Sequence, residues 1–294
     1  MLLVNILISV LLFVGGTFAK SVTSRKIDAI GFSGSGFYIY YHFGVARKLL
    51  ESGLIVPGET PMAGTSGGSY MAALNSMGVD VEDIKEAFDS TIKKCSERSC
   101  DGRLDNVASQ ILESLVPKGD AWKRSKDLVG VHITIGEEVP FTECVSLPPT
   151  GLTVTGFTSR NDLISALRAS SFVSGISKSD TCTTTFRDMY ARDGGYSKEL
   201  PCPDGFEGDN CLRVAVVPSS QWVTWSGLGG DVPLDNSTDI YPGIRGLDTL
   251  PISEGEWLKA MFNAEAIALH KYALVQLGYE DTEFWLDQNS RPRK

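Results

Sequence analysis

The amino-acid sequence predicts an α/β fold with a mostly parallel central sheet. Segments with strand-like patterns alternate along the chain with segments of helical periodicity, and this alternation is typical of a parallel sheet covered by helices. Two strand-to-helix junctions, at residues 33–37 and 64–68, are short and rich in glycine. Since a single predicted helix separates them, the two junctions fit one βαβ unit.

The first junction is predicted to hold an anion. Residues 26–32 have the pattern of a strand, and residues 38–51 have that of a mostly apolar helix. Between them stand Gly34, Ser35 and Gly36, in a turn of the kind whose backbone N–H groups point outward. A dinucleotide fingerprint would need a further glycine where Ile39 stands, and a P-loop would need a lysine that is absent. The remaining use is an oxyanion hole.

The second junction has the G-x-S-x-G pattern of a nucleophile elbow. Gly64 and Gly68 would let neighbouring backbone segments pass the turn closely, Ser66 would be the exposed nucleophile, and the N–H of Gly67 would face the oxyanion. The pattern alone is weak because glycine and serine are both common in this chain. An ordinary glycine–serine turn is the alternative.

The remaining elements alternate between the two types. Helical periodicity is seen at residues 81–97, 104–115, 161–171 and 257–277, the last ended by Gly278. Strand patterns are seen at residues 129–135, 140–147, 153–157 and 212–217. Either Ser159 or Asn161 is predicted as the N-cap of the helix near residue 161.

A serine nucleophile needs a base, and an aspartate fits better than a histidine here. The chain has three histidines, none in a triad-like pattern: His42, His132 and His270. Asp193 follows a strand-like segment, and Gly194 and Gly195 would let the backbone approach the site. Asp193 is therefore the predicted base, and a triad with His132 or His270 is the alternative. For an aspartate base we expect no histidine-like limb near pH 6–7 in the activity profile.

The composition limits the classes of function. The chain has 294 residues, 42% hydrophobic and 21% charged, which suits one large globular domain. Its formal charge is −9, so a nucleic-acid partner is excluded because phosphate binding requires a basic face. Attraction to strongly anionic lipid is disfavoured for the same reason.

The first residues predict entry into the secretory pathway. Residues 2–19 are apolar, carry no charge and end in small residues that suit a signal peptidase. We interpret 1–19 as a cleaved signal peptide and 20–294 as a single domain, which places the protein in the extracellular space, the ER lumen or a vacuole. An uncleaved membrane anchor is the alternative because the segment is near the minimum spanning length.

The cysteines and a glycosylation sequon agree with that compartment. Six cysteines permit three disulfides: Cys95, Cys100, Cys144, Cys182, Cys202 and Cys211. Cys95 with Cys100 and Cys202 with Cys211 would close local loops. Zinc is not expected, since there is no C-x-x-C motif and few histidines. Asn236 begins an N-glycosylation sequon.

The glycine loop, the elbow and the D-G-G motif together, in this order, resemble those of the patatin-like phospholipase family. The similarity covers nearly all of the mature chain and includes residues 163–177 and 195–201 on either side of the third motif. Residues 40–46, 257–262 and 278–281 are most similar to the adipose triglyceride lipase and adiponutrin branch. Three positions depart from the family pattern: Ile39 where a third glycine is frequent, Gly67 where alanine is common, and Ser174 where proline is usual.

The resemblance implies a three-layer α/β/α fold and a lipid acyl hydrolase. Ser66 and Asp193 would form a dyad without histidine, and neither a metal nor another cofactor would be needed. The substrate would be phospholipid, galactolipid or acylglycerol at a membrane or lipid-droplet interface. A catalytically inactive lipid-binding or storage protein is the alternative, favoured by Ile39 in the oxyanion loop. Trp222 and Trp225 would either line a lipid entrance or lie in the core.

Overall fold

The computed structural model describes residues 25–138, 140–146, 150–206, 208, 210–222 and 237–290. The predicted signal peptide, the sequon at Asn236 and Trp225 lie outside these ranges. None of the described helices is long and apolar enough to cross a membrane.

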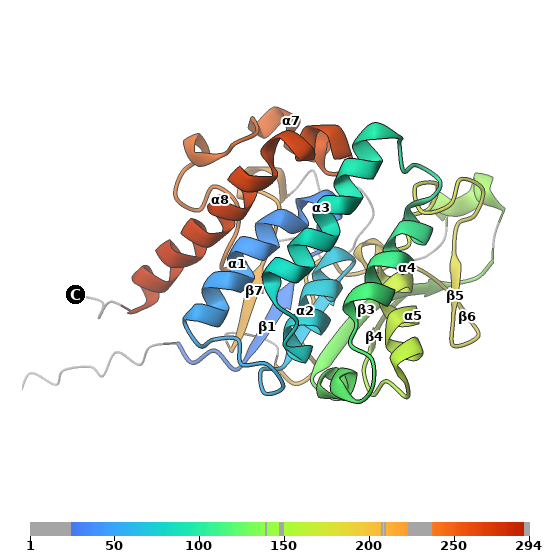
Figure 1. The fold of residues 1–294 in the computed structure, drawn as a ribbon, viewed down its shortest axis with the longest axis horizontal. Helices are drawn as coiled ribbons and strands as arrows, with labels where there is room; N and C mark the ends of the chain where they lie inside the picture. The colour runs from blue at the N-terminus through green and yellow to red at the C-terminus, as the bar shows by residue number, and fades with distance from the viewer. Residues whose placement is uncertain are drawn as a thin grey trace, which may run out of the picture.

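The described strands form one seven-stranded mixed sheet (Figure 1). They are β1 (Ala29–Phe32), β2 (Met62–Thr65), β3 (Val129–Gly136), β4 (Thr150–Val154), β5 (Thr184–Phe186), β6 (Met189–Asp193) and β7 (Cys211–Val214). Strands β7, β1, β2 and β3 are parallel neighbours in this order. Strands β4, β5 and β6 add antiparallel pairs on the β3 side. The predicted α/β class and the parallel centre of the sheet are confirmed.

Helices flank this sheet (Figure 1). The α-helices are α1 (Ile39–Glu51), α2 (Gly67–Met77), α3 (Val81–Glu97), α4 (Leu104–Leu115), α5 (Arg160–Ser170), α7 (Glu254–Ala260) and α8 (Ala264–Ser290). Short 3₁₀ turns are η1 (Gly36–Tyr38), η2 (Ala121–Ser125), η3 (Phe141–Ser146), η4 (Gly194–Tyr196), η5 (Ser219–Gln221) and η6 (Leu247–Thr249). Every residue of α2 is buried, so the helix that follows the elbow lies in the hydrophobic core.

Local signals explain where several helices begin. The Ser159 hydroxyl accepts a hydrogen bond from the N–H of Asp162, so Ser159 is the N-cap of α5, as one of the two sequence alternatives proposed. Asp80 caps α3 in the same way through the N–H of Glu82.

Trp222 is a core residue. Its ring is buried and contacts Tyr241 edge-on, and its indole N–H donates to the Val217 carbonyl.

Two predicted elements are wrong. The predicted strand at 140–147 is the 3₁₀ turn η3, because a disulfide ties Cys144 to Cys182 and the Cys144 carbonyl accepts a hydrogen bond from Arg192. The predicted single helix at 257–277 is two helices. The chain turns at Asn263, whose side chain accepts the N–H of Ala266 at the start of α8, and α8 then runs on through Gly278.

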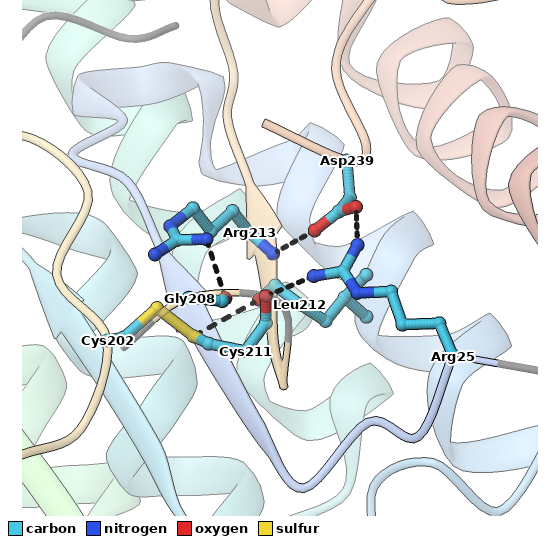
Figure 2. The surroundings of a disulfide bond; sticks show 7 residues. All are labelled: Arg25, Cys202, Gly208, Cys211, Leu212, Arg213 and Asp239. Atoms are coloured by element: carbon cyan, nitrogen blue, oxygen red, sulfur yellow. Dashed lines mark hydrogen bonds and ion pairs between the residues drawn. A yellow bond between two sulfur atoms is a disulfide. The ribbon is translucent and has the colours of Figure 1, made fainter. Parts of the chain in front are cut away.

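All six cysteines are paired. The two predicted local loops, Cys95–Cys100 and Cys202–Cys211, are present together with Cys144–Cys182. The Cys202–Cys211 bond lies at the start of the edge strand β7 (Figure 2).

An arginine reinforces this edge. Arg25 forms an ion pair with Asp239 and donates to the Cys211 carbonyl at 2.6 Å (Figure 2). Asp239 in turn accepts the backbone N–H of Arg213 in β7. The first described residues of the body are thereby fixed to the last strand of the sheet.

Candidate active site

Ser66 lies on a strained turn between β2 and α2. Its backbone has φ 51° and ψ −128°, a conformation that non-glycine residues adopt at a cost of about 1–3 kcal/mol. The Ser66 carbonyl accepts hydrogen bonds from the N–H and the hydroxyl of Ser69. The strand–turn–helix geometry of a nucleophile elbow is therefore present at the predicted serine.

The two outer glycines of this motif permit close backbone contacts. A Cβ atom on Gly64 would lie 2.3 Å from the Gly68 carbonyl oxygen, and a Cβ on Gly68 would lie 2.2 Å from the Ser33 carbonyl oxygen. Both contacts involve backbone atoms, which cannot move aside without displacing the loop. Gly64 and Gly68 thus let the elbow lie directly against the end of β1.

Ser170, at the end of α5, supports the elbow. Its hydroxyl accepts the backbone N–H of Ser66 at 2.8 Å and donates to the His132 carbonyl at 2.6 Å. The serine turn is therefore tied to the central strand β3. No sequence motif indicates this residue, because its role depends on a contact between positions 104 residues apart.

Asp193 is the last residue of β6 and lies next to Ser66. Its carboxylate accepts the N–H of Gly195 at 2.8 Å, and the Ser66 hydroxyl lies close enough to favour the ionised carboxylate. Burial raises the pKa of Asp193 to about 6, although the Ser66 hydroxyl and the Gly195 N–H oppose the shift by stabilising the ionised form. Asp193 is therefore ionised above about pH 6.

The pairing register of β3 explains why these two residues meet. Thr65 of β2 is paired with His132 of β3, and Asp193 of β6 is paired with the next residue, Ile133. Both His132 and Ile133 pair with β4 as well, so β2 and β6 must share the opposite side of β3. The two strands therefore approach each other end to end, and the residues at their ends meet.

Gly194 and Gly195 fit this junction. A Cβ on Gly194 would lie 2.3 Å from the His132 carbonyl oxygen, which excludes any other residue there. A Cβ on Gly195 would lie 2.9 Å from a carboxylate oxygen of Glu199 and 3.1 Å from one of Asp193. Gly194 lets the turn pack against β3, and Gly195 leaves room for the two carboxylates.

The glycine loop at residues 34–36 lies beside the elbow. Gly36 has φ 49°, in the left-handed region that favours glycine, and a Cβ there would lie 2.8 Å from the Met261 carbonyl oxygen. Gly36 and Gly67 each begin a helix, so their N–H groups have no acceptor within it. Within the described ranges, the N–H groups of Ser35, Gly36 and Gly67 donate to no other backbone carbonyl.

Gly34 differs from its neighbours in the predicted oxyanion loop. Its N–H already donates to the Glu199 carbonyl at 3.2 Å, so Gly34 fixes the loop and does not direct a donor at the site. The buried carboxylate of Glu199 also lies against Gly34, 3.1 Å from where its Cβ would be. Glu199 thus contacts both glycine turns, and sequence reasoning missed it.

The Ser35 side chain occupies the position that a side chain at residue 67 would take. The Ser35 hydroxyl oxygen lies 2.1 Å from the position of a Cβ on Gly67. An alanine at position 67, which is common in the resembling family, would therefore require the Ser35 hydroxyl to rotate away from its present position. Ile39, a second of the three departures, lies at the start of α1 and lines the neighbouring cavity, while the positive φ of the turn falls on Gly36.

The histidines lie in structural positions. His42 is fully buried with its Nε2 3.0 Å from the Ser33 carbonyl oxygen. His132 contacts the hydroxyls of Thr153 and Ser197. Burial lowers the pKa of both rings to about 4, so both are neutral at physiological pH. His270 lines a separate cavity between α7 and α8.

A narrow apolar cavity of about 60 Å³ opens beside Ser66. Its walls come from the glycine loop, the start of α1, the elbow, α2, α3, α4, the segment that follows α5 and the segment between α7 and α8. The lining residues are Gly36, Phe37, Ile39, Ser66, Gly67, Tyr70, Phe88, Thr91, Leu104, Val107, Ala108, Ile111, Ser171, Val173 and Phe262. We call it the acyl cavity, because its lining suits a hydrocarbon chain. The described residues hold no group of three or more metal-ligating side chains.

Comparison with protein-family models identifies this arrangement. The model described as Patatin-like phospholipase matches residues 31–204, more than half of the chain. The chain belongs to the patatin-like phospholipase family. The matched region contains the glycine loop, the elbow and the D-G-G motif, so the family assignment and the site geometry concern the same residues.

The individual relatives are distant. Omega-hydroxyceramide transacylase of Homo sapiens is 26% identical over 185 residues, which cover 59% of this chain and 31% of that protein. A patatin-like phospholipase domain-containing protein of Aspergillus oryzae is 43% identical over 58 residues, 20% of this chain and 8% of that protein. The chain thus spans less than a third of the length of the curated relatives it matches.

One solved structure, VipD from Legionella pneumophila, aligns with 90% of this chain and 67% of its own, with a TM-score of 0.44 and 12% identity.

Proposed function

We propose that this chain is a serine acyl hydrolase that cleaves fatty-acyl ester bonds of lipids through Ser66 and Asp193. The observation that carries the proposal is the juxtaposition of Ser66, on a strained elbow beside an apolar cavity, with the buried carboxylate of Asp193 at the end of β6. Family membership supports lipid acyl hydrolysis in general, and we propose phospholipid, galactolipid or acylglycerol as the substrate.

The first half of the reaction would form an acyl-enzyme. The Ser66 oxygen attacks the ester carbonyl as Asp193 accepts its proton, and the alcohol leaves with a proton returned by Asp193. A carboxylate with a pKa of about 6 is a stronger base than an ordinary aspartate. In the second half, Asp193 would remove a proton from water, which attacks the acyl carbon. The fatty acid is released as the bond to the Ser66 oxygen breaks, and Asp193 returns the proton to that oxygen.

Three backbone donors would stabilise the tetrahedral intermediate. The N–H groups of Ser35, Gly36 and Gly67 lie beside Ser66 and donate to no backbone carbonyl within the described ranges. Donors fixed in advance of the reaction stabilise the oxyanion strongly, and removal of one typically costs about 2.7–4 kcal/mol. Gly34 would support this loop without taking part, since its N–H is already paired with Glu199.

The disulfides support a place in the secretory pathway. Three disulfides without a free cysteine suit an oxidising compartment. We therefore propose that residues 1–19 act as a signal peptide and that the enzyme works in a secretory compartment or outside the cell.

Ser66→Ala tests the proposed function. We expect this variant to lose about a thousandfold or more of kcat in hydrolysis of a panel of lipids and of soluble short-chain esters, because no other nucleophile is positioned at the elbow. Circular dichroism and thermal unfolding would serve as the control for folding. If Ser66→Ala hydrolyses any of these esters about as fast as the wild type, Ser66 is not the nucleophile and the assignment is rejected.

A further inference from the structure

The acyl cavity opens toward one particular side of the molecule. It shares Phe37, Leu104 and Phe262 with a larger groove of about 400 Å³. The groove is bounded by residues 95–101 at the end of α3 and by residues 259–265 between α7 and α8. A lipid that reaches Ser66 by this route must therefore pass the start of α8, which lies beside α7 and the end of α3 (Figure 1).

Apolar side chains are exposed along the helix that begins at this groove. Phe262, on the shared wall, is 36% exposed, Leu269 is 79% exposed and Tyr272 is 66% exposed. Glu265 also lines the groove, and positions four and seven residues later lie on the same side of an α-helix. Leu269 and Tyr272 therefore continue the groove along α8. They are the two most exposed large hydrophobic residues in the described part of the chain.

The charges around these residues are balanced. Lys271 pairs with Asp89, and Lys259 pairs with Glu256. The ammonium groups of Lys271 and Lys85 also lie 5.0 and 5.9 Å from the centre of the Tyr272 ring. With a net charge of −9, the protein has no basic surface excess to attract anionic lipid. A lipid surface without net charge fits this side of the molecule.

We propose that Phe262, Leu269 and Tyr272 form a docking face that seats the enzyme on a zwitterionic membrane. This inference rests on the proposed lipid acyl hydrolase function. Transfer of a leucine side chain from water to the acyl region of the membrane lowers the free energy. A tyrosine keeps its hydroxyl near the headgroups while its ring enters the interface. The groove then faces the membrane. Its polar lining suits the headgroup of a lipid, and the acyl chain enters the acyl cavity past the apolar residues that the two share, Phe37, Leu104 and Phe262.

The test compares vesicle binding with catalysis on a soluble ester. Leu269→Asp/Tyr272→Asp is expected to bind phosphatidylcholine vesicles at least tenfold more weakly than the wild type in co-sedimentation. Its hydrolysis of the vesicle lipid should fall in parallel, while kcat/KM for a soluble butyrate ester should stay within twofold, since neither residue lines the acyl cavity. Leu247→Asp is the matched control, because Leu247 is 46% exposed and lines neither the acyl cavity nor the groove.

Several results would overturn the docking face. They are unchanged vesicle binding by the double variant, equal loss in Leu247→Asp, or a concentration-dependent dimer that the double variant abolishes while vesicle binding persists. If the activity of the double variant on the soluble ester also falls, the milder Leu269→Asn/Tyr272→Asn is measured instead. Its loss of vesicle binding is then compared with its loss of kcat/KM on the soluble ester. Ser66→Ala should bind vesicles like the wild type. Failure of the hydrolase proposal would appear only in that variant's activity.

Discussion

Ser66 is held in a left-handed conformation by contacts that only small neighbours allow. The space above the first residue of α2 is occupied by the hydroxyl of Ser35, so two positions 32 residues apart in the printed sequence depend on each other. A substitution at one of them should therefore change the effect of a substitution at the other.

Gly67→Ala is expected to lower kcat/KM at least tenfold. In an ordinary helix the change would be neutral or stabilising. Here the new methyl group would lie 2.1 Å from the Ser35 hydroxyl oxygen and would force that hydroxyl to give up its hydrogen bond to the Gly36 carbonyl within the oxyanion loop. The double variant Ser35→Gly/Gly67→Ala should recover most of the lost activity. Steady-state kinetics on a soluble ester measures both, with Ser35→Gly alone as control. Equal activity of Gly67→Ala and Ser35→Gly/Gly67→Ala would show that the two positions are independent.

The activity of the enzyme should depend on pH through Asp193. Because the base must be ionised, log kcat/KM should rise with pH up to about 6 and remain level above it, following the pKa that burial raises to about 6. The expectation of a profile without a limb near pH 6–7 is therefore revised, since a buried aspartate titrates in the usual histidine range. A midpoint near 4 would show that Asp193 is solvated or is not the base.

Helices α1 and α8 cross at two glycines. A Cβ on Gly44 would lie 1.9 Å from the Val275 carbonyl oxygen, and a Cβ on Gly278 would lie 2.1 Å from the Tyr41 carbonyl oxygen. Nearby, Asp281 of α8 accepts hydrogen bonds from Tyr41 and Arg245. The sequence pattern predicts that Gly278 ends the helix. In the structure Gly278 lies within α8 and permits the close crossing with α1.

Gly278→Ala is expected to destabilise the protein by about 1–3 kcal/mol or more, the usual range for an overpacked core. Helix propensity alone predicts the opposite sign, a gain of about 1 kcal/mol. Gly255→Ala in α7 is the matched control, because nothing lies within 4 Å of its Cβ position, and it should be neutral or slightly stabilising. Urea unfolding measures both. A stabilised Gly278→Ala variant would contradict the crossing.

Elements with strong local signals could be predicted, and elements that depend on distant partners could not. The apolar periodicity of α3 and the cap at Ser159 lie within a few residues of the helices they define. The segment before Asp193 has a strand-like pattern, but the turn of the β5–β6 hairpin has no comparable signal. Its residues Arg187 and Asp188 have positive φ although neither is glycine or asparagine. Strand β6 gains its place by pairing with β3, and β5 by pairing with β6.

At the scale of the whole molecule, the site is assembled by strand order. The motifs around Ser66 and Asp193 are visible in the sequence because each needs glycines next to it. Ser170 and Glu199 were not predictable, since the first acts through the backbone of Ser66 and the second packs against glycines from two distant loops. The N–H of Gly34 was assigned to the oxyanion hole from its motif alone. Its hydrogen bond to the Glu199 carbonyl is seen only in the folded chain.

The distribution of disulfides follows the same distinction. Cys95–Cys100 and Cys202–Cys211 close short loops and could be paired by proximity in sequence. Cys144 and Cys182 are 38 residues apart, and their pairing depends on the antiparallel part of the sheet, which brings η3 beside the segment before β5.

The central claim is that Ser66 is the nucleophile and Asp193 its base. Mass spectrometry of peptides after reaction with a fluorophosphonate tests it most directly, because the reagent marks the activated nucleophile itself. The rate of labelling would be followed in the wild type, Asp193→Asn, His132→Gln and His270→Ala, each checked for folding by circular dichroism.

We predict a single adduct on the peptide that contains Ser66. Asp193→Asn should react at least a hundredfold more slowly, because an asparagine cannot accept the serine proton. The two histidine variants should react within about tenfold of the wild type, since His132 is held by Thr153 and Ser197 and His270 lines a separate cavity. An adduct on another residue, or full labelling of Asp193→Asn with loss in a histidine variant, would contradict this account.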